Sequence, residues 1–296
     1  MFSPRIVLLA ALACISLALT LALFPAPAPA AVTEVLTYAL TPSTQPGSRS
    51  DSTAISGDGR YVAFASTAPN LVVGDTSTEP DIFAYDRLTG TTTLVSVDSA
   101  GSPAGGGSSW PAISGDGRYV AFCSWAWLVP EDTNNVSDVF VRDRDAGTTA
   151  RVSVDSAGSE GDQMCDSTAI TPDGRYVAFW SHATNLVAGD TNGFWDVFRH
   201  DRTTGITTRV SVDSAGNQMD AEDIRTWIHP AISADGRYVA FGAEATNLVT
   251  GDTNGAADIF VRDVVAGTTE RVSIDGAGAQ GDGASEYPAI SADGRY

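Results

Sequence analysis

Lysine is absent from the sequence, and positive charge of any kind is scarce. All 17 basic residues are arginines, and 36 acidic residues give the 296-residue chain a net charge of −19 at neutral pH. Without lysine the chain can form neither a Schiff base nor a nucleotide-binding P-loop. An acidic surface repels the phosphates of nucleic acids and of anionic lipids. We therefore expect no nucleic-acid partner and no docking on a membrane surface.

Common catalytic motifs are also missing. The three histidines fall in different positions of the repeat described below, so the sequence does not indicate a shared metal. There is no Gly-x-Ser-x-Gly and no His-Glu-x-x-His, the patterns typical of many hydrolases. We predict no catalytic residues; a Ser-His-Asp set dispersed along the chain is an alternative that the composition leaves open.

Long hydrophobic runs are confined to the N-terminus. Arg5 precedes the apolar run 6–24, and an Ala-x-Ala site follows at Ala28 and Ala30. This order is typical of a secretory signal peptide. We expect residues 1–30 to be cleaved, which leaves a mature chain, 31–296, that is secreted, periplasmic or on the cell surface. The alternative is an uncleaved membrane anchor, because the run is longer than most signal sequences have.

Cysteine is rare in the mature chain, where only Cys123 and Cys165 remain. Exported proteins can keep disulfides, whereas a buried free thiol behaves as a small hydrophobic side chain. The sequence leaves both alternatives open for this pair.

What the sequence does contain is a long repeat. The motif Ala-Ile-Ser-Gly-Asp-Gly-Arg-Tyr-Val-Ala-Phe begins at residue 54, and copies begin near residues 112, 169, 231 and 289. After each complete copy come an acidic connection, an Asp-Ile-Phe-Val-Arg-Asp-like segment and a Thr-Arg-Val-Ser-Val-Asp-like segment. Repeats of this length are typical of propellers and solenoids.

Each repeat predicts four strands and no helix. Asp-Gly supplies the positive φ of a tight hairpin between the first two strands. The second strand, Tyr-Val-Ala-Phe, is apolar at consecutive positions, which favours burial on both faces. We therefore predict an all-β protein, a β-propeller of four-stranded antiparallel blades with four complete blades and the start of a fifth. Residues 32–40 are expected to form the outer strand of the closing blade, and the chain is expected to be part of a longer open reading frame.

The repeated motif resembles the WD40-like propeller repeats of the TolB type. Ser-Ala-Asp-Gly-Arg-Tyr-Val-Ala-Phe at 233–241 and Asp-Ile-Phe-Val-Arg-Asp at 258–263 carry the resemblance, and Thr-Pro-Asp-Gly at 171–174 is nearest to the family's Ser-Pro-Asp-Gly turn. The resemblance covers about residues 32–296. It implies an exported or periplasmic interaction platform, or a propeller that is fused to a peptidase or acts as a lyase. The acidic connection lengthens each unit beyond the common repeat, so the family's known interactions do not transfer.

The acidic connection is the best candidate for a metal site. It reads Asp-x-Asn or Asp-x-Ser, with a further Asp four residues on. Oxygen ligands at this spacing suit Ca²⁺, but EF-hand ligand positions 5 and 12 are missing. The alternative is an Asx-turn that satisfies the backbone of a long loop. The candidate ligands are Asp75 and Asp81; Asp132, Asn134 and Asp138; Asp190, Asn192 and Asp196; Asp252, Asn254 and Asp258.

The Asp-Gly-Arg element recurs in every copy and is interpreted as scaffold. A catalytic pair is seldom needed in each blade of one protein. We expect the Asp to shape the turn, and the Arg to pair between blades with the Asp that ends the third strand, such as Asp86 or Asp143.

Departures from the repeat are candidates for function, because the shared residues suffice for the fold. Aromatic residues replace small or polar ones in the second and third repeats and in the longer linker before the fourth. An exposed Trp is an effective anchor for a sugar ring or a protein partner; the alternative is that these side chains fill gaps between blades. The predicted binding residues are Trp125, Trp127, Trp180, His182, Trp195 and Trp227.

Together these features predict an exported, non-catalytic propeller that binds a protein or a cell-wall polysaccharide. The alternative is the propeller domain of a hydrolase or lyase whose catalytic residues lie beyond Tyr296.

Overall fold

The computed structural model describes residues 50–221 and 229–296, all of which belong to the unit Leu36–Tyr296. The signal peptide, the strand expected at 32–40 and Trp227 lie outside these residues. Blade one contains β1 (Ser50–Ile55), β2 (Tyr61–Ser66), β3 (Asp81–Asp86) and β4 (Thr91–Leu94). Blade two contains β5 (Ser108–Ile113), β6 (Tyr119–Ser124), β7 (Asp138–Asp143) and β8 (Thr148–Arg151). Blade three contains β9 (Cys165–Ile170), β10 (Tyr176–Ser181), β11 (Asp196–Asp201) and β12 (Ile206–Arg209). Blade four contains β13 (Ala231–Ile232), β14 (Tyr238–Ala243), β15 (Asp258–Asp263) and β16 (Thr268–Arg271).

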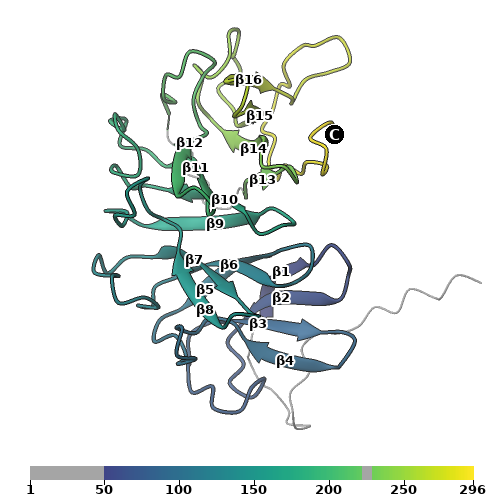
Figure 1. The fold of residues 1–296 in the computed structure, drawn as a ribbon. Coiled ribbons are helices and arrows are strands. Elements are labelled where there is room, and N and C mark those ends of the chain that lie inside the picture. The colour runs from purple at the N-terminus through teal and green to yellow at the C-terminus, as the bar shows by residue number, and fades with distance from the viewer. Residues whose placement is uncertain (1–49, 222–228) are drawn as a thin grey trace, which may run out of the picture. The chain divides into compact units, whose positions relative to one another are not determined.

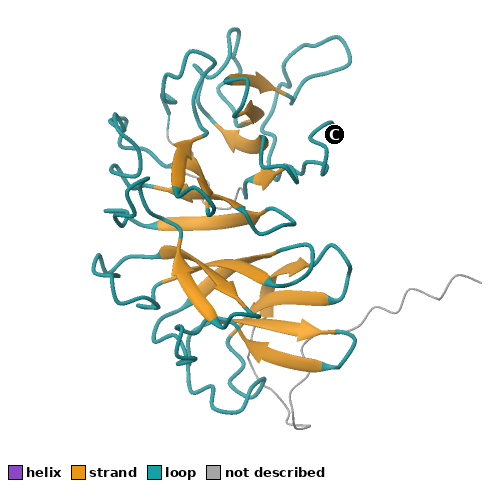
Figure 2. Ribbon diagram, viewed as in Figure 1, coloured by secondary structure: helices purple, strands orange, loops and turns teal. Residues whose placement is uncertain are grey.

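Every blade is a four-stranded antiparallel meander, with the strands side by side in chain order (Figures 1 and 2). The register is the same throughout: Phe64 pairs with Phe83 in blade one, and Phe122 with Phe140 in blade two. The described residues contain strands, turns and loops but no helix. The prediction of an all-β propeller with four-stranded blades is confirmed.

The Asp-Gly-Arg turn has the predicted geometry. Asp58 accepts hydrogen bonds from the Ser56 hydroxyl and the Arg60 amide, and Gly59 has a φ of +71°. Only glycine adopts this left-handed conformation without strain. The local sequence therefore fixes the hairpin before any packing is considered.

The arginine of this turn pairs within its own blade, which corrects the prediction of a pair between blades. In blade one, Arg60 donates from Nε and Nη2 to the two oxygens of Asp86, at 3.0 and 2.7 Å. Arg118 and Asp143 repeat the arrangement in blade two. The bidentate guanidinium lowers the pKa of Asp143 to about 2. Each pair therefore ties the second strand of a blade to the end of the third.

The hydrophobic cores lie between consecutive blades. One core combines Ala63 and Ile82 of blade one with Phe122 and Phe140 of blade two. The next joins blades two and three, and a third joins blades three and four. A fully buried Phe contributes about 1.5–3 kcal/mol, so much of the stabilisation of a blade comes from its neighbour. This is why the second strand is apolar on both faces.

A second contact between blades is steric. The turn glycine of blade two, Gly117, has a φ of +75°, and a Cβ there would lie 2.1 Å from the ring of Tyr61 in blade one. Arg144 covers the same ring at 4.5 Å and donates to the Gly117 carbonyl at 2.6 Å. The Tyr ring is therefore held between two segments of the following blade.

Both described cysteines are free and buried. Cys165 donates to Ser181 at 3.3 Å, and burial raises the pKa of the Cys165 thiol to about 12. The two thiols serve as small hydrophobic side chains, so the disulfide alternative is wrong.

Candidate functional site

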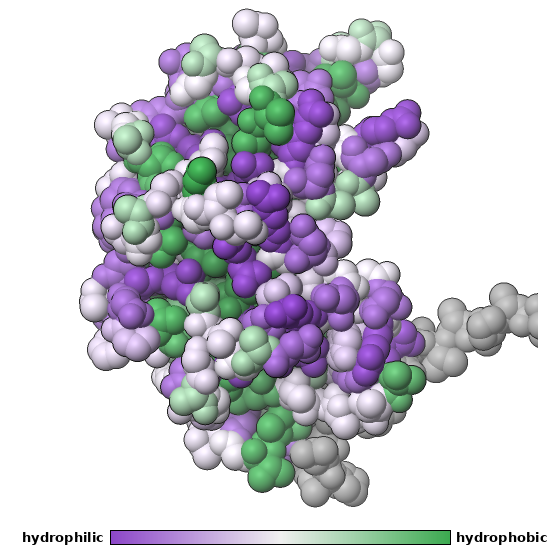
Figure 3. Space-filling model, in the orientation of Figure 1, coloured by the Kyte–Doolittle hydropathy of each residue, from purple (hydrophilic) through white to green (hydrophobic). Residues whose placement is uncertain are grey.

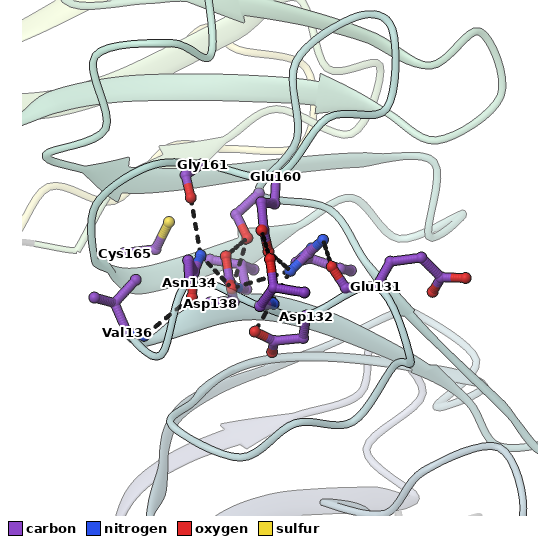
Figure 4. A network of polar contacts seen from close by, with 12 residues as sticks. Glu131, Asp132, Asn134, Val136, Asp138, Glu160, Gly161 and Cys165 are labelled. Atoms are coloured by element: carbon purple, nitrogen blue, oxygen red, sulfur yellow. Dashed lines mark hydrogen bonds and ion pairs between the residues drawn. The ribbon is translucent and has the colours of Figure 1, made fainter.

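The acidic connections form a pocket at the start of the third strand in each blade. In blade two the pocket holds Asp132, Asp138 and Glu160, whose carboxylate oxygens lie within 4.8 Å of one another. Arg151 extends Nη1 toward all three carboxylates, at 3.6, 3.4 and 2.7 Å (Figure 4). The Arg151 side chain is only 5% exposed. A buried cation thus already balances the acidic cluster.

Hydrogen bonds add to the ion pairs of this pocket. Asn134 donates from Nδ2 to Asp138 and to the Gly161 carbonyl, at 3.0 and 2.8 Å (Figure 4). Ser153 donates to the other oxygen of Asp138 at 2.5 Å. Burial and the neighbouring charge of Asp138 raise the pKa of Asp132 to about 6. The Asx-turn expected as the alternative to calcium is present as well, because Asn134 accepts from the Val136 amide.

Blades three and four repeat the arrangement. Arg209 contacts Asp190 at 3.0 Å and Asp196 at 3.4 Å, and Arg271 contacts its two aspartates at 3.4 and 3.5 Å. In these three blades a guanidinium occupies the position between the carboxylates that a metal ion would take. Calcium binding there stays a prediction, and the ion would have to displace a buried arginine. The ligands concerned are Asp132, Asn134 and Asp138; Asp190, Asn192 and Asp196; Asp252, Asn254 and Asp258.

Two of the predicted aromatic residues lie on the surface. Trp125 is 53% exposed and Trp127 is 67% exposed, whereas the intervening Ala126 and the following Leu128 are buried. The alternation shows that the chain directs its small and aliphatic side chains into the core and both indoles into solvent. These two Trp do not fill a gap between blades.

The exposed Trp pair stands where other blades carry a polar clamp. In blade three, Thr184 and Asn185 of the connection bond to Asp162 and to the Glu160 carbonyl of the preceding linker. In blade four, Thr246 and Asn247 make the same bonds to Asp220 and Gln218. In blade two, Trp127 replaces both clamp residues.

The preceding linker of blade two differs in the same place. It reads Pro-Ala-Gly-Gly-Gly at 103–107 and has no counterpart of the clamp aspartate. A Cβ on Gly106 would lie 3.0 Å from the Trp125 backbone, so the glycine allows the two segments to approach. A groove of about 530 Å³ lies beside Trp127, and its lining includes Asp98, Pro130 and Glu131.

The other predicted aromatic residues have different surroundings. Trp180 is 6% exposed and lies in the core between blades three and four; as a surface anchor it is wrong, because its position in β10 faces the next blade. His182 and Trp195 pack edge to face, 5.8 Å between ring centroids, and Trp195 is half-buried against the same core. Trp227 lies outside the described residues. The structure thus does not gather the six predicted residues into one surface.

A further cluster was not predicted. The first strands of the four blades line a cavity of about 370 Å³, where Trp110 and His229 face each other with ring centroids 4.6 Å apart. Ser167 and His229 form a hydrogen bond through Oγ and Nδ1, and burial lowers the pKa of His229. A hydroxyl, a neutral imidazole and an indole can together hold a small polar ligand.

Variation within the repeat was the signal for this cluster. The residue two positions before Ala-Ile is Ser52, Trp110, Ser167, His229 or Tyr287, whereas the residue that follows it is always Thr or Pro. Ser52, Trp110, Ser167 and Tyr287 have φ of 49–58°, a left-handed conformation that is uncommon for such residues. Recurrence in several blades indicates that it belongs to the bulge in the first strand.

Similarity to known proteins is limited. No family model matches the chain. The curated dipeptidyl-peptidase 5 of Porphyromonas endodontalis is 35% identical over 80 residues, which are 27% of this chain and 11% of that protein. The solved TolB of Acinetobacter baumannii is 19% identical with a TM-score of 0.45. The match covers 76% of this chain and 43% of the TolB chain. The putative TolB of Agrobacterium tumefaciens is 19% identical with a TM-score of 0.48, and covers 82% of this chain and 70% of its own.

The chain folds as a β-propeller. The repeated four-stranded meanders, the cores between consecutive blades and the first strands around one cavity establish this fold. At the identities found, the likeness to TolB concerns the fold, and the propeller spans only a small part of the curated peptidase. Within residues 50–221 and 229–296, the propeller has no helix long and apolar enough to cross a membrane.

Proposed function

We propose that this propeller is an exported, non-catalytic scaffold that binds a cell-wall polysaccharide or a protein through the Trp125–Trp127 surface. The observation that carries the proposal is the exposure of two indoles in one connection, where blades three and four have a polar clamp. On the face shown in Figure 3, hydrophobic residues occur in small patches among hydrophilic ones. Exposed Trp contributes strongly to binding because it buries a large, rigid surface.

The chemistry of the groove favours a polysaccharide over a protein. Trp127 offers a flat face for a sugar ring, and the carboxylates of Asp98 and Glu131 accept hydrogen bonds from hydroxyl groups. The net charge of −19 disfavours an anionic polymer. A neutral or cationic, hydroxyl-rich polymer fits both properties.

A retention assay on purified, insoluble cell-wall glycan tests this proposal. We expect the wild-type chain to sediment with the glycan and Trp125→Ala/Trp127→Ala to stay in the supernatant. Val265→Ala is the matched control, because this side chain is 75% exposed in blade four and lies outside the groove. Retention of the double variant would refute the surface. Retention only on material that still contains wall protein would indicate a protein partner.

Export is part of the proposal and rests on the N-terminal sequence. The order of Arg5, the apolar run 6–24 and the Ala-x-Ala site supports cleavage after Ala30. N-terminal sequencing of the protein from its native host should begin at Ala31. A chain that retains Met1 in the membrane fraction would favour the uncleaved anchor instead.

A second candidate is the propeller domain of a hydrolase or lyase whose catalytic residues lie beyond Tyr296. The 80-residue match to dipeptidyl-peptidase 5 supports it. The sequence of the gene after the Tyr296 codon distinguishes the two: a Gly-x-Ser-x-Gly segment supports the enzyme, and further repeats followed by a stop support the scaffold.

A further inference from the structure

The acidic pocket of blade one differs from the other three in the residues that neutralise it. In blade two the cation is Arg151, the last residue of the fourth strand; blade one has Leu94 at this position. The bridging residue of the following linker is Glu160 in blade two and Pro103 in blade one. Both side chains that complete the pocket elsewhere are thus replaced together.

Blade one nevertheless keeps its carboxylates. Asp81 is 1% exposed, and its Oδ1 accepts a hydrogen bond from Ser96 at 2.6 Å. Its Oδ2 is buried and has no hydrogen-bond partner in the described part of the chain. The equivalent oxygen of Asp138 in blade two accepts hydrogen bonds from Asn134 and Arg151. This buried, unpartnered oxygen indicates that a further donor or cation must bind beside Asp81.

The missing partner must come from the pocket itself or from solution. In blade two the side chains that bond to Asp138 come from the same blade: Asn134, Arg151 and Ser153. A preceding blade contributes none of these contacts. The corresponding segment of blade one, 74–104, contains no arginine after Arg87, and Arg87 donates to the distant Gly59 carbonyl.

The remaining groups around Asp81 are oxygen ligands. Burial, and to a smaller extent the negative charge of Asp75, raise the pKa of Asp81 to about 6. The Ser77 hydroxyl lowers the pKa of Asp81. This hydroxyl also donates a hydrogen bond to the Glu79 carbonyl at 3.2 Å. Two carboxylates and a hydroxyl suit a hard divalent cation, with water completing the shell.

We propose that blade one binds one Ca²⁺ between Asp75 and Asp81, in the position that the guanidinium of Arg151 takes in blade two. Ser77 supplies a further oxygen. The site substitutes a metal ion for a protein cation in the one described blade that lacks the arginine. With only two carboxylates, the dissociation constant should lie at about 0.1–1 mM, as in extracellular calcium modules.

Thermal unfolding of the full chain with added calcium tests the proposal. At about 10 mM CaCl₂ and neutral pH, we expect the midpoint of the wild type to rise by about 3–6 °C, because the ion binds only the native state. MgCl₂ at the same concentration controls for screening of the acidic chain and should give a smaller shift, because Mg²⁺ sheds its water reluctantly.

Two variants assign the effect to blade one. Leu94→Arg installs the guanidinium of the other blades and should remove the calcium shift while raising the midpoint without calcium. Asp81→Asn keeps the shape of the side chain, removes its charge and should also remove the shift. Asp190→Asn, in the arginine-filled pocket of blade three, should leave it unchanged.

The proposal is overturned if the wild type does not respond, if magnesium produces an equal shift, or if Asp81→Asn responds fully. Loss of the shift in Asp81→Asn together with its retention in Asp190→Asn supports the proposal, even if Leu94→Arg does not fold.

Discussion

Blades one and two share a backbone and differ in three places. The pocket of blade two is closed by Arg151 and that of blade one is not. Blade two presents an exposed Trp pair, where blade one has Thr-Ala-Pro-Asn at 67–70. The turn glycine of blade two contacts Tyr61, whereas a Cβ on Gly59 would meet nothing within 4 Å. Residues common to both blades build the hairpins and cores. The differences that bear on ligand binding are Leu94 in place of Arg151 and the exposed Trp pair of blade two.

The largest expected effect comes from giving blade two the pocket of blade one. Arg151→Leu leaves Asp132 and Asp138 buried without their cation, and we expect a loss of about 3–5 kcal/mol in the free energy of unfolding, measured by urea titration. Arg118→Leu is the control, because this arginine is 40% exposed and its loss should destabilise the protein much less. Equal losses would show that the buried pocket has no special energetic role.

The pH dependence of stability sharpens the same contrast. The folded chain holds the pKa of Asp81 at about 6, above the ordinary 3.8, so the native state binds this proton more tightly than the unfolded state. The resulting stabilisation is complete below the unfolded pKa and is lost as the pH rises through about 6, up to about 3 kcal/mol.

Asp81→Asn measures that contribution. In calcium-free buffer, the wild type should lose unfolding free energy relative to the variant as the pH rises from acidic to neutral. A constant difference would mean that Asp81 does not titrate in the folded protein.

A smaller effect isolates the contact between blades. Gly117→Ala and Gly59→Ala introduce the same strain, because both glycines have similar positive φ, 75° and 71°. Only Gly117→Ala also pushes its new methyl group against the Tyr61 ring. We expect Gly117→Ala to be about 1–3 kcal/mol less stable than Gly59→Ala in chemical denaturation; equal stabilities would show that the ring moves aside freely.

The smallest effect on stability concerns the Trp connection. Trp127→Ala should change the unfolding free energy by no more than about 0.5 kcal/mol, since the indole is 67% exposed. Leu128→Ala, one residue further and 3% exposed, should cost about 2–5 kcal/mol. Similar losses for both would place the indole in the core and remove it as an anchor.

The fold could be predicted from the sequence because its determinants are local and repeated. Asp-Gly fixes the hairpin at Gly59, and the doubly apolar Tyr-Val-Ala-Phe strand requires a neighbour on each face. The pairing of Arg60 with Asp86 was predicted, but not that it lies within one blade. Sequence spacing predicts which residues form such a pair, but not whether they meet within one blade or between two blades.

The site was less predictable, because it depends on register. Arg151 reads as part of an alternating outer strand, yet its register opposite Phe140 directs it into the acidic pocket. Trp180 and Trp125 both depart from the repeat. Trp180 lies within β10 and faces the core between blades three and four, whereas Trp125 follows the end of β6 and is exposed. The cluster of Ser167 and His229 unites residues of different blades; the variable position of the repeat marks these residues but does not indicate that they meet.

The most direct test of the claim that blade one replaces an arginine with an ion is crystallographic. Crystals of the full chain, grown with calcium and then exchanged into terbium, would give an anomalous difference map. The account predicts one strong peak between Asp75 and Asp81 and none in the pockets of Arg151, Arg209 and Arg271. Peaks in all four pockets, or none in blade one, would contradict it.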